Sequence, residues 1–181
     1  MPNRMIMNYQ AKLLGAGFQD KSLFKFIMFD VCHNEQGFQY TLDRILKKFG
    51  KDSKINIVIN VKANKEIQFE NIIERLEHES IVNIYPTRTN NSWSADPNDL
   101  KRELDNISTK ISQKSIVVEN GDIDEIMKFV CGKILQSKKQ EGVLICGSFY
   151  MMSHVKTKLG YQQNIDSEEM EEVKGNDRNY R

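Results

Sequence analysis

The fold of this chain is constrained most by an alternation of short apolar runs with longer segments of helical periodicity. Each run is rich in β-branched and aromatic residues, which is typical of a buried strand. The runs are Phe24–Val31, Ile55–Val61, Ile81–Tyr85, Ile116–Val118 and Val143–Cys146, with a weaker one at Met5–Tyr9. Strands that alternate with helices form crossover units. We therefore predict an α/β fold: a Rossmann-like, mostly parallel sheet of about six strands with helices on both faces.

The segments between the runs carry apolar side chains at spacings of three and four residues, as amphipathic helices do. The five stripes are Leu42, Ile45, Leu46 and Phe49; Phe69, Ile72, Ile73 and Leu76; Leu100, Leu104, Ile107 and Ile111; Ile123, Ile126, Met127, Val130 and Ile134; and Phe149, Met152, Val155 and Leu159. We interpret all five as core. Residues 1–160 then form one domain, and residues 161–181 a charged tail that we expect to be disordered.

Composition excludes several classes of partner. Lys and Arg number 26 against 25 Asp and Glu, so no overall field attracts nucleic acid or an anionic membrane. No run approaches the roughly 20 apolar residues of a membrane span. The three cysteines show no CxxC spacing, which fits a reducing compartment. We expect a cytoplasmic monomer with no membrane or nucleic-acid partner and no metal ligands of its own; a mitochondrial form stays open.

Polar residues follow the expected strands where each one ends. Asp30, Cys32, His33 and Asn34 come directly after the first long run. Since carboxyl ends of parallel strands share one edge, where α/β proteins bind ligands, this stretch is either part of a binding site or a polar turn. The loops after later strands hold Ala63–Glu66, Thr87–Trp93 and Gly147–Ser148.

Gly147 permits a tight strand-to-helix turn, and Ser148 can cap the helix that follows. The free amide groups of that helix would favour an anionic ligand at the same edge. A plain Gly-Ser cap explains the pair equally well.

Other features carry less information. Gly15–Ser22 has the outline GxxxxGKS, but Asp20 replaces the second glycine and a strand follows, so we interpret it as a loop. Cys32 and His33 are neighbours in an extended segment and point to opposite faces, so Cys32 is expected to be a small buried side chain. We expect His78 and His154 to be solvated. Trp93 is either a loop anchor or a stacking surface near the site.

Four stretches resemble one protein family. F-D-V-C-H-N, residues 29–34, resembles the D-x-A-H-N signature of the C-terminal domain of Mur-type ligases. G-V-L-I-C-G-S-F-Y-M-M-S-H-V, residues 142–155, resembles the V-L-V-T-G-S-L-Y-L-V-G-x-V ending of the folylpolyglutamate synthase and dihydrofolate synthase branch. Pro2-Asn3-Arg4 looks like the P-G-R that opens this domain, and Ala63–Glu66 resembles a D-K-D loop less closely. Their order and spacing agree over residues 2 to about 159.

The resemblance implies an ADP-forming amide ligase. A folate or dihydropteroate carboxylate attacks the γ-phosphate of ATP, and the amino group of L-glutamate then displaces phosphate from the acyl phosphate. In this family the phosphate loop, the Mg²⁺ ligands and most of the folate site lie in an N-terminal ATPase domain. We expect that domain to be missing here and the isolated chain to be inactive.

The resemblance also implies roles for individual residues. Arg4 would neutralise phosphate charge, Asp30 would accept hydrogen bonds from the ATP ribose, and His33 would act catalytically at the γ-phosphate. Asn34 belongs to the same ATP-binding loop and is expected to cap the following helix. On the side of the acyl phosphate and glutamate, the candidates are Lys65 and Ser148.

Departures from the family pattern leave alternatives open. Asn3 replaces a glycine and Cys32 an alanine, both mild changes. The D-N-P-R stretch that meets the incoming amino acid in many relatives is replaced by Thr89–Trp93 here. The expected arginine is therefore missing, and the sequence does not predict which amino acid this loop would bind; Arg88 is an alternative to the missing arginine. The alternatives are the matching domain of another Mur-type ligase, acting on a peptidoglycan precursor, and a non-catalytic α/β binding domain.

Overall fold

The computed structural model describes residues 6–7, 24–32, 34–50, 53–63, 70, 82–89, 92–111, 119–137 and 139–158. Three of the predicted site residues, Arg4, His33 and Lys65, lie outside these residues. So do His78, the loop Gly15–Ser22, the strand expected at Ile116–Val118, the tail, and the stripe from Phe69 to Leu76; Glu70, inside that segment, is helical. Among the described helices, none is both long enough and apolar enough to cross a membrane.

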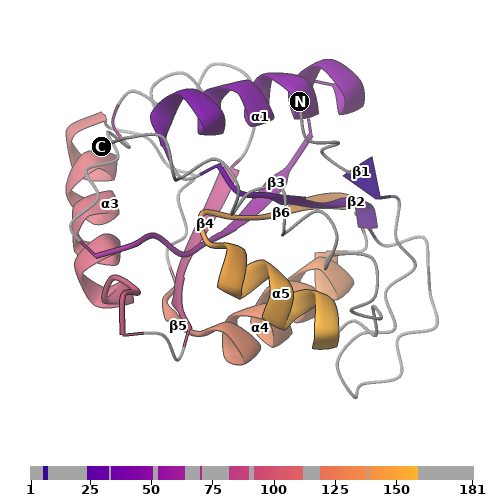
Figure 1. The fold of residues 1–181 in the computed structure, drawn as a ribbon. Coiled ribbons are helices and arrows are strands. Elements are labelled where there is room, and N and C mark those ends of the chain that lie inside the picture. The colour runs from indigo at the N-terminus through magenta and orange to yellow at the C-terminus, as the bar shows by residue number, and fades with distance from the viewer. Residues whose placement is uncertain are drawn as a thin grey trace, which may run out of the picture.

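The described strands form one sheet in the order β1-β2-β6-β3-β4-β5. Five strands are parallel, and β1 pairs antiparallel with β2 (Figure 1). The strands are β1 (Ile6–Met7), β2 (Phe24–Asp30), β3 (Ile55–Ile59), β4 (Val82–Arg88), β5 (Gly121–Asp122) and β6 (Glu141–Cys146). The prediction of a mostly parallel α/β sheet is confirmed.

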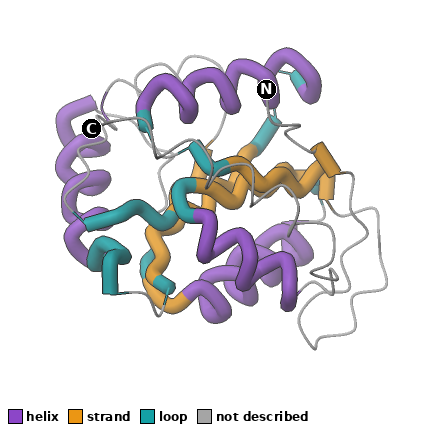
Figure 2. Tube along the Cα trace, viewed as in Figure 1, coloured by secondary structure: helices purple, strands orange, loops and turns teal. Residues whose placement is uncertain are grey.

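Helices cover both faces of the sheet, as predicted. The four longer described helices are α1 (Glu35–Phe49), α3 (Pro97–Ile111), α4 (Ile123–Ser137) and α5 (Phe149–Lys158). Figure 2 shows α1 and α3 on one side of the strands and α4 and α5 on the other. Successive side chains along a strand point to opposite faces of the sheet, so each strand contributes to both helical layers. On β6, Leu144 and Cys146 pack towards α1 and α3, whereas Val143 and Ile145 pack towards α4 and α5.

Among the described stripe residues, those on α1, α3 and α4 are buried or, like Phe49, partly buried, and one on α5 is exposed. On α5, Met151, Met152 and Val155 are buried, but Phe149 is 39% exposed. Phe149 was expected to face inward; it lies in the first turn of the helix, past the last residue of β6, where no strand remains to cover it. Several strand limits also differ from the prediction. β2 ends at Asp30 and β3 at Ile59, earlier than expected, whereas β4 runs on through Pro86 to Arg88 and β6 begins at Glu141.

A buried polar network closes the amino end of the sheet beneath α4. Glu141 is 2% exposed; its carboxylate accepts hydrogen bonds from Lys54 Nζ at 2.9 Å and Asn56 Nδ2 at 2.8 Å. Asn56 Oδ1 in turn accepts from Asn83 Nδ2 at 3.0 Å and from the Tyr85 hydroxyl at 3.3 Å. Burial, with smaller contributions from the carboxylates of Glu141 and Glu119, raises the pKa of Tyr85 to about 12.

This pKa makes a prediction about alkaline unfolding. The folded protein holds the Tyr85 proton more tightly than the unfolded chain, whose pKa is near 10.0. Stability from this group is therefore full below pH 10 and is lost as the pH rises towards 12. Between pH 9 and pH 11.5 we expect the wild-type protein to lose about 2 kcal/mol more of its free energy of unfolding than Tyr85→Phe.

Urea denaturation followed by circular dichroism at the two pH values measures this difference. Tyr40→Phe is the matched control, because Tyr40 is 54% exposed and should leave the pH dependence unchanged. Parallel pH curves for the wild type and Tyr85→Phe would contradict the prediction.

Candidate functional site

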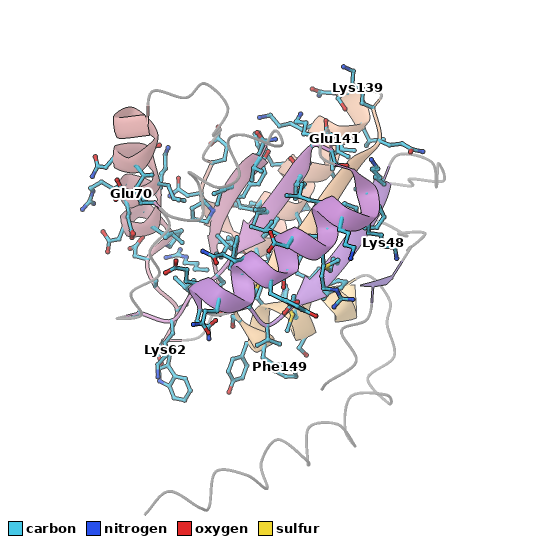
Figure 3. All side chains as sticks on the ribbon, turned by 90° about the horizontal axis from the view of Figure 1, so that it is seen from above. Lys48, Lys62, Glu70, Lys139, Glu141 and Phe149 are labelled. Carbon is cyan, nitrogen blue, oxygen red and sulfur yellow. The ribbon has the colours of Figure 1, made fainter. Side chains whose placement is uncertain are left out.

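The polar loops of the parallel strands gather at one edge. The carboxyl ends of four strands are in register, with Asp30 opposite Cys146, Cys146 opposite Ile59, and Ile59 opposite Pro86. Figure 3 shows Lys62 and Phe149 at this edge, and Lys48, Lys139 and Glu141 at the opposite one. The edge thus brings together the loops of Asp30, Asn34 and Ser148, as predicted from the sequence.

Asp30 is held from the side of α1. It is only 6% exposed, and its Oδ2 accepts a hydrogen bond from Thr41 Oγ1 at 2.7 Å. Thr41 lies eleven residues later, on the buried face of α1. A ligand hydroxyl would have to reach a carboxylate that is largely covered, so the ribose contact of Asp30 stays a prediction.

Asn34 caps α1. Its backbone is extended, with φ −138° and ψ 165°, and its Oδ1 accepts a hydrogen bond from the Gly37 amide at 2.8 Å. The predicted capping role is confirmed, because the side chain satisfies one of the amides that a helix start leaves unpaired. An ATP contact of Asn34 stays a prediction.

All three cysteines are buried. Cys32 is 3% exposed, as predicted, and its thiol lies 3.9 Å from the Asp30 carbonyl oxygen. Burial above all, and then the neighbouring Cys32 and Asp30, raises the pKa of the Cys146 thiol well above its usual range. Burial raises the pKa of Cys131 to about 12. Cys131 and Cys146 therefore stay protonated at neutral pH, which argues against a thiolate nucleophile in either position.

The turn from β6 to α5 requires its glycine. Gly147 has φ +98°, and a Cβ there would collide with the carbonyl oxygen of Asn60. Ser148 stands at the cap position, where its carbonyl oxygen accepts a hydrogen bond from the Met152 amide at 3.2 Å. The predicted tight turn is confirmed. The start of α5 carries a partial positive charge towards this edge, and whether it serves an anion or only begins a helix stays open.

The loops after β3 and β4 are joined to each other. Lys62 and Ser94 form an antiparallel bridge, flanked by hydrogen bonds from the Ala63 amide to the Trp93 carbonyl oxygen at 2.8 Å and from the Ala95 amide to the Val61 carbonyl oxygen at 2.9 Å. The backbone of Trp93 thus anchors the loop. Its ring is nevertheless 59% exposed, and Lys62 Nζ lies 5.6 Å from the ring centroid.

His154 differs from expectation. It was expected to be only solvated, but its Nε2 lies 2.9 Å from Asp124 Oδ1 in the first turn of α4. The two helices pack on the same face of the sheet, which brings these half-exposed groups together.

Two residues near the site escaped the sequence analysis. Thr41 orients Asp30, and the only available signal was a hydroxyl residue beside the apolar stripe of α1. Lys62 contacts Trp93, and its only signal was its position directly before the loop Ala63–Glu66. Among the described residues, no cluster of three His, Cys, Asp or Glu side chains could hold a metal ion.

The fold and its loop edge define a class: an open, mostly parallel α/β domain of the Rossmann-like type. No family model matches the chain, and no curated protein matches it in sequence. Solved structures of Mycobacterium tuberculosis folylpolyglutamate synthase do match its fold. The structure described with ADP and AMPPCP gives a TM-score of 0.57 at 14% identity, and one with ADP gives 0.52 at 16%.

Each match covers 76% of this chain but only 30% of the synthase chain. The chain thus spans less than a third of the length of the enzymes it resembles. The resemblance seen in the motifs is confirmed for the fold, which is consistent with that of a C-terminal domain of this type.

The turn at Gly147 can be tested directly. Gly147→Ala places a side chain at φ +98° and against Asn60, so the free energy of unfolding should fall by at least about 1–2 kcal/mol from backbone strain alone. Gly132→Ala is the matched control, because a Cβ there meets no other described group within 4 Å and alanine favours the helix α4. Urea denaturation measures both variants. An unchanged stability for Gly147→Ala would show that the turn is not held as described.

Proposed function

We propose that this chain is the C-terminal domain of an ATP-dependent folylpolyglutamate synthase, with or without dihydrofolate synthase activity. The observation that carries the proposal is a coincidence of fold and motif. The fold of this chain matches part of such a synthase, and the match covers 30% of the synthase chain. The two stretches that resemble the family most, residues 29–34 and 142–155, also contain the carboxyl ends of two neighbouring strands, with Asp30 opposite Cys146.

The proposed reaction joins L-glutamate to a folate carboxylate through an acyl phosphate, with ATP as the phosphoryl donor. In it Asp30, positioned by Thr41, accepts hydrogen bonds from the nucleotide ribose, and Asn34 fixes the loop between Asp30 and α1. Arg4 and His33 act on the phosphates, as charge partner and as catalytic donor. Lys65 and Ser148 are the candidates for contacts with the acyl phosphate and glutamate.

Mg²⁺ would assist the phosphoryl transfer from the N-terminal ATPase domain. The contribution that we assign to this chain is to close over the nucleotide and orient it. Affinity of the isolated chain for ATP should then be millimolar or weaker, because the phosphate loop lies elsewhere.

The complete protein that contains this sequence provides the main test. We expect phosphate release that requires ATP, a folate and L-glutamate together, whereas the 181-residue chain alone unfolds cooperatively but turns nothing over. Turnover with a peptidoglycan precursor instead of folate would favour another Mur-type ligase. A complete protein with no ligase activity at all would favour a non-catalytic binding domain, and ligation by the isolated chain would refute the proposal.

Asp30 gives a sharper test within the complete protein. Asp30→Asn keeps the shape but removes charged hydrogen bonds worth about 1.5–3 kcal/mol, so the KM for ATP should rise roughly ten- to a hundredfold with the KM for glutamate little changed. Thr41→Val removes the partner hydroxyl and leaves the carboxylate. Because the carboxylate itself remains, Thr41→Val should raise the KM for ATP less than Asp30→Asn does. If both variants change the KM for ATP and the KM for glutamate to the same extent, Asp30 has a structural role only.

A further inference from the structure

Lys62 and Trp93 form a cation–π pair unlike the others in the described part of the chain. The remaining pairs are Arg44 over Tyr40, Lys48 over Phe49 and Lys133 over Phe129. In each of these, both members lie on one helix and are four residues apart or adjacent. Helix geometry brings residues four apart together, and Lys48 and Phe49 are neighbours in the sequence. Lys62 and Trp93, by contrast, come from the loops after two different strands, so their contact needs a separate explanation.

The backbone holds this pair in place. The bridge between Lys62 and Ser94 and the two flanking amide bonds fix one loop against the other. Asn60 adds a side-chain amide that donates to the Thr87 carbonyl oxygen at 2.7 Å and to the Ser94 hydroxyl. A rigid backbone lowers the entropy that a ligand must remove on binding, so the pair is preorganised.

The ring itself stays in contact with solvent. Trp93 is 59% exposed although Lys62 lies over it, and an exposed indole is a common binding surface because it combines a large apolar face with a polar edge. Phe149, at the start of α5, is 39% exposed at the same edge (Figure 3). Tyr150, the next residue of the helix, is 57% exposed. Exposed aromatic rings thus follow both β4 and β6.

A second observation comes from the same loop, four residues before Trp93 in the sequence. The hydroxyl oxygen of Thr89, directly after β4, is buried and has no hydrogen-bond partner among the described residues. Buried polar atoms are almost always paired in folded proteins, so this hydroxyl is a position where a ligand or water can bind.

We propose that Lys62 and Trp93 form a binding subsite for a planar ring linked to an anionic group. The ring stacks on the indole, and the anion pairs with the Lys62 ammonium group. This deepens the proposed function, on which the identity of the ligand rests. Two substrates of that reaction share the chemistry: the adenine and phosphates of the nucleotide, and the aroyl-glutamate end of the folate.

Trp93 is the single tryptophan of the chain, so its fluorescence reports on this subsite alone. The 181-residue chain is titrated separately with ADP and with p-aminobenzoyl-L-glutamate. We expect one of them to quench the fluorescence saturably, with a dissociation constant of order millimolar. Saturation by ADP assigns the subsite to the nucleotide, and saturation by the aroyl-glutamate assigns it to the folate. A linear, unsaturated response to both would overturn the proposal.

Matched variants test the role of the cation. Lys62→Gln should weaken binding about three- to tenfold, as expected for a partly exposed charge pair. Lys133→Gln removes the cation of the pair on α4 and should change nothing. Equal weakening by both variants would mean general electrostatic attraction and would overturn the subsite.

The complete protein separates this inference from the proposed function. There, Trp93→Ala should raise the KM for the assigned ligand and leave the other substrates unaffected. If ligation is intact and this KM is unchanged, the subsite is wrong and the proposed function stands. If the complete protein does not ligate but Lys62→Gln still weakens the fluorescence titration, the subsite stands and the proposed function is wrong.

Discussion

The sheet depends on the parallel pairing of β6 with both β2 and β3. Leu144 lies opposite Met28 on one side and Ile57 on the other, and all six residues of β6 are buried. The strand also supplies both cores, since its side chains alternate between the two faces. A glycine bounds it at each end because a neighbour fills the space: the ring of Phe26 at Gly142, and the Asn60 carbonyl oxygen at Gly147. Neither layer can be completed until this late strand is inserted.

The central place of β6 also explains the position of the candidate site. After β2 the chain continues into α1 on one face of the sheet, and after β6 it continues into α5 on the other face. The loops that follow these two neighbouring strands therefore run to opposite faces of the sheet. In open α/β sheets, ligands bind outside the carboxyl ends of strands at such a switch point. Asn34 and Ser148 each precede one of these helices, and Asp30 ends β2 at the same edge, opposite Cys146.

Local pattern was enough to predict the helices, the class of sheet and the cap at Asn34, because these depend on residues close in sequence. The order of the strands could not be predicted from local pattern, because the position of β6 between β2 and β3 depends on pairing across most of the chain. The burial of Asp30 depends on a hydroxyl from α1, and the exposed pair of Lys62 and Trp93 depends on two loops meeting. Both are contacts between elements, which no single periodicity encodes. Phe149 was misplaced for a related reason: its stripe continues past the strand that should cover it.

The two edges of the sheet differ in how their polar groups are satisfied. At the amino edge, Glu141 and Asn56 bind each other and their neighbours, and this closed network leaves Tyr85 fully buried and neutral. At the carboxyl edge, the backbone is held as firmly, but an indole remains exposed and the hydroxyl of Thr89 lacks a partner among the described residues. Folding alone explains the first edge, since every group there contributes to stability. At the carboxyl edge, the exposed Trp93 indole and the Thr89 hydroxyl, which is unpaired among the described residues, each cost free energy that folding does not require. A ligand that covers Trp93 and satisfies Thr89 would remove both costs.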